Sequence, residues 1–108
     1  MKYILLLTCL LLSLNINAEV FMPSAFTPNN DGKNDFFHPI NLPKTSHVIE
    51  FKVFNRGGNL VFDNPNNPSW DGTFNGVIQD LGVYFYMIKV VDSSGNFELK
   101  MGQVTLIR

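Results

Sequence analysis

A repeat of period two in the apolar residues is the feature that most limits what this chain can fold into. The alternation recurs after residue 18, where no segment keeps apolar residues at helical spacing over three turns. In "VIEFKVF" we expect Ile49, Phe51 and Val53 to share one face of a strand. The segment "GVYFYMIKVVD" is apolar at both parities, which predicts a central strand covered on both faces or nearly so.

The last alternating run, "NFELKMGQVTLIR", changes parity along its length. Phe97, Leu99 and Met101 occupy odd positions, whereas Val104 and Leu106 occupy even ones. The change falls at Gly102. We therefore expect a bulge or bend at this glycine that re-aims the side chains.

Turn-forming residues separate the alternating runs. "NRGGN" predicts a hairpin with Gly57 or Gly58 at positive φ, and "DSSGN" predicts a second hairpin before the last run. "DNPNNPS" carries two prolines that cannot donate to a strand ladder, so it predicts a loop. Short strands, frequent turns and no helix indicate an antiparallel β-sandwich of about six or seven strands.

Residues 1–18 have the layout of a secretory signal peptide. Lys2 precedes an apolar run, and small Ala18 stands at the expected cleavage site. The run is shorter than the roughly 20 apolar residues that span a bilayer, so we expect no membrane span in the mature chain. The domain is expected to cover residues 19–108. Cleavage of the predicted signal peptide would remove Cys9, which is the single cysteine of the chain. The domain then has no disulfide, so its fold must be held together by its core or by bound ions.

The composition argues against nucleic-acid binding and catalysis. The formal net charge is −1 and no cluster of basic residues stands out, so neither nucleic acid nor an anionic membrane is an expected partner. His38 and His47 are isolated, no strained Gly-x-Ser-x-Gly turn is present, and the domain lacks a thiol. We predict a domain that is not an enzyme.

The segment "AFTPNNDGKNDFF" allows two interpretations. Its oxygens could bind calcium through Asn29, Asp31 and Asp35, with a distant carboxylate such as Asp71 or Asp80. Aligning Gly32 with the glycine of a twelve-residue calcium loop leaves Thr27 and His38 at the first and last ligand positions, however. The favoured interpretation is that these side chains satisfy the loop backbone through Asx-turns, with Gly32 at positive φ. No cofactor is expected, with calcium as the minority hypothesis.

The segment "WDGTFNG" also allows two interpretations. An exposed Trp70 could stack on sugar rings, as in a secreted adhesive or carbohydrate-binding module. The favoured interpretation places Trp70 in the core and makes Asp71 and Gly72 a tight turn. The tyrosines of "YFY", Tyr84 among them, are likewise expected to pack in the sandwich rather than to bind a ligand.

Together, "AFTPNNDGKNDFF", "FKVFNRGGNLVFD", "WDGTFNG", "LGVYFYMIKV" and "GQVTLIR" resemble one family in order and spacing. This is the gliding-motility-associated C-terminal domain, or type B sorting domain of the type IX secretion system. The resemblance covers nearly all of residues 19–108. It implies an Ig-like β-sandwich that directs a protein through the periplasm to the cell surface or the extracellular space. Family members normally follow a cargo region, whereas here the predicted signal peptide adjoins the domain.

The resemblance also implies partners and a recognised surface. The partners would be the outer-membrane translocon and an outer-membrane protein of the PorP/SprF type. We expect recognition at one end loop and the terminal strand, taken as an edge strand open to strand addition; its residues are Asn29, Asp31, Asp35, Arg56, Leu106, Ile107 and Arg108. The residues expected to serve the fold are Phe26, Pro28, Gly32, Gly57, Trp70, Asp71, Gly72, Gly82, Tyr84 and Gly102.

Overall fold

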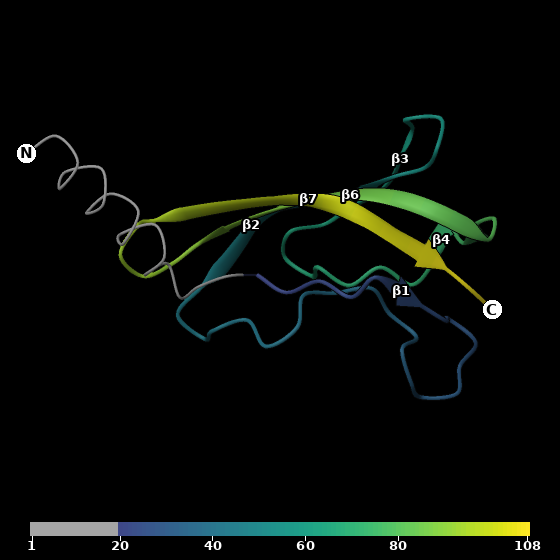
Figure 1. Cartoon of the computed structure of the whole chain (residues 1–108), viewed down its shortest axis with the longest axis horizontal. Helices are drawn as coiled ribbons and strands as arrows, with labels where there is room; N and C mark the ends of the chain where they lie inside the picture. The colour runs from purple at the N-terminus through teal and green to yellow at the C-terminus, as the bar shows by residue number, and fades with distance from the viewer. Residues whose placement is uncertain (1–19) are drawn as a thin grey trace, which may run out of the picture.

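A computed structural model describes residues 20–108, and the predicted signal peptide lies outside this range. The described part of the chain is all-β (Figure 1). Five strands form one sheet in the order β1-β7-β6-β2-β3. Their bounds are β1 Ala25–Phe26, β2 His47–Phe54, β3 Leu60–Asp63, β6 Gly82–Val91 and β7 Phe97–Leu106. A two-stranded sheet pairs β4, Thr73–Phe74, with β5, Val77–Ile78.

Both predicted hairpins form, and in each a side chain stabilises the turn. Asn55 Oδ1 accepts hydrogen bonds from the N–H groups of Gly57 and Asn59 between β2 and β3. The left-handed residue of this turn is Gly58, with φ of 84°, rather than Gly57. Between β6 and β7, Asp92 Oδ1 accepts from the N–H groups of Ser94 and Asn96.

The core lies against one face of the five-stranded sheet. On β6 every second residue from Tyr84 to Val90 is buried, and β7 contributes Val104 and Leu106. The intervening residues of β6 face outward, where Phe85 is 41% exposed. The prediction that this central strand is covered on both faces is therefore wrong for its outer face, because the second layer packs on the inner face alone.

The second layer consists mainly of extended segments rather than paired strands. Two isolated bridges join these segments, Phe21 with Ile40 and Phe37 with Trp70. Backbone hydrogen bonds of 2.8 and 2.9 Å run in both directions between Phe37 and Trp70. The Trp70 ring then meets Phe26 at 5.4 Å and Tyr84 at 5.0 Å between centroids. Aromatic packing thus fastens the second layer to the sheet, at separations typical of favourable pairs.

The register shifts in this sheet fall in the pairings of β2 with β6 and with β3, and the pairing of β6 with β7 has none. The β2–β6 register shifts between Val48 and Glu50, which leaves Ile49 39% exposed and out of line with buried Phe51. The pairing of β6 with β7 is unbroken from Gly82–Leu106 to Val91–Phe97. The predicted bulge at Gly102 is therefore wrong.

The apolar residues of β7 shift from odd to even positions because the two halves of the strand present apolar residues on opposite faces. Phe97, Leu99 and Met101 point outward and are exposed, while Val104 and Leu106 point into the core. Gly102 is required for a different reason than a bend. A Cβ at this position would lie 2.7 Å from the Tyr86 hydroxyl oxygen.

The C-terminal end of β7 is not a sheet edge. β1 pairs with it in parallel, with Ala25 opposite Thr105 and Phe26 opposite Leu106. The N–H groups of Thr105 and Ile107 donate to the carbonyl oxygens of Ser24 and Phe26. Strand addition at the last residues of the chain, as expected from the sequence, is therefore blocked by β1.

Candidate functional site

The loop between β1 and the Phe37 bridge is shaped by one carboxylate. Asp35 Oδ1 accepts hydrogen bonds from the N–H groups of Asn29 and Asn30, and its Oδ2 accepts from Gly32. Gly32 has φ of 83°, and Asn30 and Asn34 are also left-handed. These are the residue types that adopt this conformation at least cost. The loop therefore folds around Asp35.

Two further side-chain oxygens of the loop, from Asn29 and Asp31, also bind its own backbone. Asn29 Oδ1 accepts from the Asp31 N–H, and Asp31 Oδ1 accepts from the Lys33 N–H. These i to i+2 bonds are Asx-turns. Across residues 20–108 no three His, Cys, Asp or Glu side chains are grouped so that they could share a metal ion.

The phenylalanines that flank the loop differ in their placement. Phe26 and Phe37 are buried at 1% and 0% exposure, and their rings lie 5.9 Å apart. Phe36 is 52% exposed, so it does not anchor the loop to the core. In an extended segment, successive side chains point to opposite faces. Only one residue of the Phe36–Phe37 pair can then enter the core.

The end of the chain lies beside this loop. Leu106 is 1% exposed and belongs to the core, so it is not available to a partner in the folded domain. Ile107 is 46% exposed. Arg108 Nη1 donates to the carbonyl oxygen of Gln79 at 2.9 Å, which fixes the last residue against the segment that follows β5.

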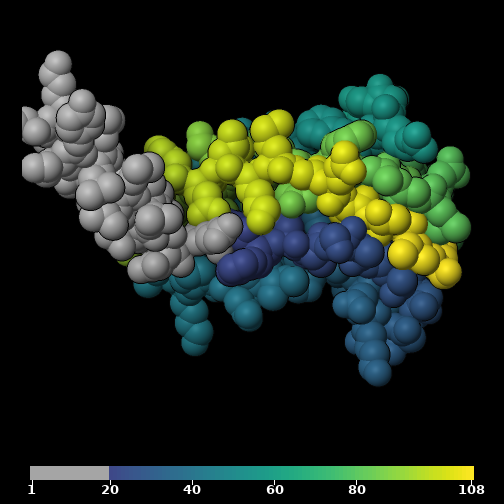
Figure 2. Space-filling view, in the orientation of Figure 1, coloured from purple at the N-terminus to yellow at the C-terminus, as the bar shows by residue number. Residues whose placement is uncertain are grey.

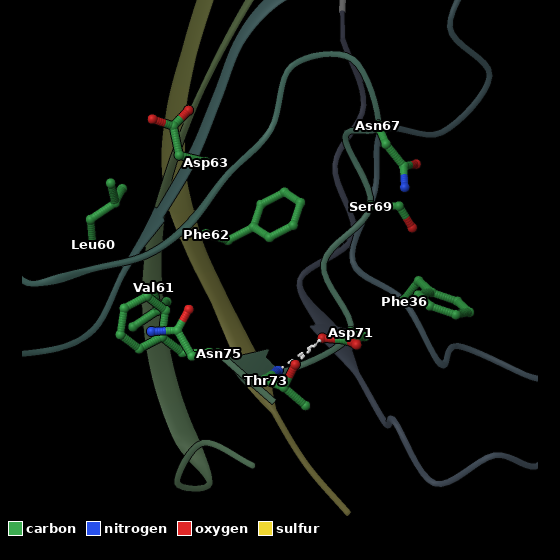
Figure 3. Close-up of a pocket in the computed structure, with 11 residues that line it drawn as sticks. Phe36, Leu60, Val61, Phe62, Asp63, Asn67, Ser69, Asp71, Thr73 and Asn75 are labelled. Carbon is green, nitrogen blue, oxygen red and sulfur yellow. Dashed lines mark hydrogen bonds between the residues drawn. The ribbon is translucent and has the colours of Figure 1, made fainter. Parts of the chain in front are cut away.

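Two adjoining depressions lie at this end of the molecule. The first, of about 420 Å³, is lined by loop residues and by Arg108, and includes Pro28, Asn29, Asn30, Asp35, Phe36, Asp71, Thr73 and Ile78. The second, of about 570 Å³, lies between β3, the loop after it and β4, and is lined also by Phe36, Asp71 and Thr73 (Figure 3). We call the residues that line these two depressions the loop-end surface.

The two depressions share Asp71 and Thr73, which belong to one turn. Thr73 donates to Asp71 Oδ1 through both its N–H, at 3.0 Å, and its hydroxyl, at 2.7 Å (Figure 3). Gly72 between them has φ of 85°, and a Cβ there would lie 3.1 Å from Pro28 Cγ and 3.3 Å from Leu106 Cδ1. The turn therefore needs glycine both for its backbone and for its close packing.

Arg56 lies in a third depression, of about 220 Å³, outside the loop-end surface. Its lining includes Gln79, Asp80 and Tyr84. The Tyr84 hydroxyl donates to the Asp80 carbonyl oxygen at 2.6 Å, which holds the start of β6, where Gly82 has φ of 132°. Burial raises the pKa of Tyr84, as does the nearby Asp80, while Arg108 opposes the shift.

The structure thus brings some of the expected recognition residues together and separates others. Asn29, Asp35 and Arg108 share one depression. Asp31 is exposed on the loop but lines neither part of the loop-end surface. Exposed apolar side chains that were not expected in a recognition surface, Phe36, Phe74 and Ile78, also line it.

The sugar-binding alternative depended on exposed aromatic rings. Trp70 is 0% exposed and Tyr84 is 4% exposed. The Trp70 indole N–H donates to the Thr73 carbonyl oxygen at 2.8 Å, so its polar atom is also satisfied inside the fold. Neither ring offers a face to a ligand.

A comparison with protein families matches residues 20–106 to the CHU_C type IX secretion signal domain. The chain belongs to this family. The match confirms the resemblance drawn from the sequence motifs, and it covers the five-stranded sheet and the loop-end surface except for Arg108. A search of curated proteins finds no match.

Membership defines the coarse role of this sorting domain. A type IX secretion signal directs its protein across the outer membrane towards the cell surface or the extracellular space, which implies contact with the secretion machinery. The family is one of secretion signals rather than of catalysts. Residues 20–108 include no helix long and apolar enough to cross a membrane.

Proposed function

We propose that this domain is the address read by the outer-membrane translocon of the type IX secretion system, and that reading occurs at the loop-end surface. The family match over residues 20–106 carries the sorting role. The choice of surface rests on geometry, because the polar loop and the last residue of the chain meet there.

The chemistry of the loop-end surface supports this choice. Phe36 and Ile78 are 52% and 66% exposed, and they lie among the charged side chains of Asp35, Asp71 and Arg108. Apolar groups surrounded by polar ones are typical of protein interfaces, and isolated exposed apolar residues are not. The surface is formed by loops on a rigid sheet, where recognition residues commonly lie.

The partner that we propose is an outer-membrane protein of the PorP/SprF type, as the resemblance to type B sorting domains implies. The mature protein would leave the inner membrane on its signal peptide, fold in the periplasm and present the loop-end surface to this partner. The domain would then make no chemical change to its cargo.

The sorting role is tested with a reporter fusion. A signal peptide and a fluorescent protein are placed before residues 19–108, and the fusion is expressed in a host with the secretion system and in a strain that lacks the translocon. We expect surface or extracellular fluorescence in the first strain only. Equal retention of the reporter in the periplasm of both strains would refute the role.

The recognised surface is tested with charge-reversal variants of the same fusion. Arg108→Glu reverses a charge on the loop-end surface. Lys44→Glu also reverses a positive charge, at an exposed site that does not line the loop-end surface. Phe36→Ser removes the exposed ring. We expect several-fold lower export for Arg108→Glu and Phe36→Ser, and unchanged export for Lys44→Glu, at equal protease resistance. Equal export by all three variants would place recognition elsewhere.

The partner is tested by deleting the PorP/SprF-type protein while the translocon is kept. We expect the wild-type fusion to accumulate in the periplasm as it does without the translocon. Normal export in that strain would show that the domain uses a different partner.

A further inference from the structure

The first half of β7, from Phe97 to Gln103, has no strand paired with its outer edge among residues 20–108. The N–H groups of Thr105 and Ile107 point away from β6 towards β1. Because N–H directions alternate along a strand, the odd-numbered residues from Phe97 to Gln103 point the same way. β1 does not extend to them, and no residue of the described range 20–108 makes a backbone hydrogen bond to this edge. Figure 2 shows this part of β7 uncovered above the N-terminal segment.

The outer face of the open edge lacks three features that prevent strands from pairing between molecules, although the same segment carries the inward-pointing charges of Glu98 and Lys100. Such edges commonly carry outward charges, a proline or a bulge. Here the pairing with β6 is regular, and the outward side chains are Phe97, Leu99 and Met101, which are 63%, 55% and 69% exposed. The nearby cation, Lys89, lies over the Phe97 ring at 4.7 Å from its centroid.

We propose that a second copy of this chain pairs with the open edge, antiparallel and with Leu99 opposite Leu99. A two-fold axis at Leu99 places Phe97 opposite Met101 of the second copy, and Glu98 opposite its Lys100. Phe97, Leu99 and Met101 then face odd-numbered residues, so their N–H groups meet carbonyl groups, and Gln103 lies beyond the paired segment. The sheet becomes continuous through both molecules, and the two-fold symmetry closes the assembly as a dimer.

Charge complementarity selects this register over its neighbours. An axis at residue 98 would oppose Glu98 to Glu98, and an axis at residue 100 would oppose Lys100 to Lys100. Like charges directly across a sheet are unfavourable, whereas opposite charges are favourable. Only the axis at Leu99 forms the Glu98–Lys100 pair, and it forms this pair twice.

An unsatisfied oxygen supports the same pairing. Glu98 Oε2 accepts from the Val20 N–H at 2.8 Å, and Lys100 Nζ donates to the Val20 carbonyl oxygen at 2.9 Å. Glu98 Oε1 is buried without a partner within residues 20–108. Side chains directly opposed across an antiparallel pair are close neighbours. The Lys100 ammonium of the second copy would then face the Glu98 side chain, and to reach the buried Oε1 it needs that side chain to turn outward.

The dimer is independent of the sorting role and compatible with it. Its axis at Leu99 lies in the first half of β7, whereas Arg108 and the loop-end surface lie beyond its other end. Both copies would keep their loop-end surfaces free for an outer-membrane partner.

The first test is the mass of the purified full-length product in solution, measured by sedimentation equilibrium from micromolar to millimolar concentration. We expect a reversible dimer. Leu99→Pro removes an N–H that has no backbone partner among residues 20–108, so it should give a monomer with an unchanged circular dichroism spectrum. Val77→Lys, at an exposed site on β5, is the control and should remain a dimer. A wild-type monomer at every concentration would overturn the proposal.

The second test fixes the register by disulfide trapping in a Cys9→Ser background. Leu99→Cys places two thiols on opposed residues, whose Cα atoms should lie about 5.5 Å apart, within disulfide range. Phe97→Cys places them about 13 Å apart, since four residues separate the two positions. We expect Leu99→Cys alone to form cross-linked dimers with itself. Equal cross-linking of Phe97→Cys with itself, or none for Leu99→Cys, would contradict the register.

Discussion

Asp35 shows how one side chain determines the shape of a loop. Its two carboxylate oxygens accept three backbone N–H groups, from Asn29, Asn30 and Gly32. Asp31, four residues earlier, accepts one, from Lys33. The sequence indicated that such side chains would bind the backbone, but it did not distinguish the central carboxylate from the peripheral one.

We therefore predict unequal effects for two similar substitutions. Asp35→Ala should lower the free energy of unfolding by about 1–2 kcal/mol, since hydrogen bonds to a charged acceptor are lost and water replaces them in part. Asp31→Ala should change it by less than about half of that amount. Urea denaturation of both variants measures the difference. Equal effects would show that Asp35 has no special position in the loop.

Calcium binding by this loop was the minority hypothesis from the sequence and is untested, and a chelator tests it. Because the oxygens of Asn29, Asp31 and Asp35 already bind backbone N–H groups, we expect the loop to keep its shape without an ion. The melting temperature should then be the same in calcium and in a chelator. A fall of several degrees in the chelator would establish a bound ion, since a ligand of the folded state raises stability by RT ln(1 + [L]/Kd).

At the scale of elements, β7 shows what periodicity can and cannot settle. The apolar residues of β7 change from odd to even positions at Gly102, as the sequence indicated, but the strand stays regular there. The glycine is needed because the Tyr86 ring, 6% exposed, lies where a Cβ would be. Close packing across a strand pair depends on which residues face each other, and the sequence of one strand does not specify that register.

We predict that Gly102→Ala destabilises the fold by about 1–3 kcal/mol, the usual cost of forcing extra atoms into a packed region. Gly57→Ala is the matched control, because its added Cβ would meet no atom closer than 3.4 Å. Thermal melts followed by circular dichroism compare the two variants. A milder effect of Gly102→Ala than of Gly57→Ala would mean that Tyr86 moves aside freely.

The β6–β7 hairpin should respond to acid through Asp92. Its hydrogen bond from Asn96 is the main reason that the pKa of Asp92 lies below its ordinary value of 3.8. A lowered pKa in the folded state means that the unfolded chain binds the proton more readily. The stabilisation is therefore complete above the ordinary pKa and is lost as the pH falls through the lower, folded-state pKa.

Asp92→Asn tests this dependence. The difference in melting temperature between wild type and Asp92→Asn should be constant near neutral pH and shrink as the pH falls below the ordinary pKa of Asp92. An NMR titration of the Asp92 carboxyl carbon gives the pKa directly. A difference in melting temperature that grows as the pH falls would show that the pKa of Asp92 is raised, not lowered, in the folded state.

At the scale of the whole molecule, Trp70 joins the two layers. It pairs with Phe37 through the backbone, packs on Phe26 and Tyr84, and is fully buried. The second layer has few ladder hydrogen bonds of its own, so it depends on such contacts for its position. Aromatic packing here replaces a second full sheet.

Trp70→Ala should cost about 3–5 kcal/mol, the range for deleting a large aromatic side chain from a core. Domains have a total stability of roughly 5–15 kcal/mol, so the variant should lose a large fraction of it and melt at a much lower temperature. Trp70 is the single tryptophan, and its fluorescence in the wild type should unfold together with the circular dichroism signal. Separate transitions would show that the second layer melts independently of the sheet.

The sequence by itself determined the all-β class, the two hairpins, the candidate loop and the family, because alternation, turn residues and motif spacing are local properties of the chain. It did not determine the exposure of Phe36, the covering of the C-terminal end of β7 by β1, or the open half of the same strand. These features depend on which segments, distant in the sequence, share the limited inner face of one sheet. Only the tertiary structure decides that, since each segment that packs there excludes the others.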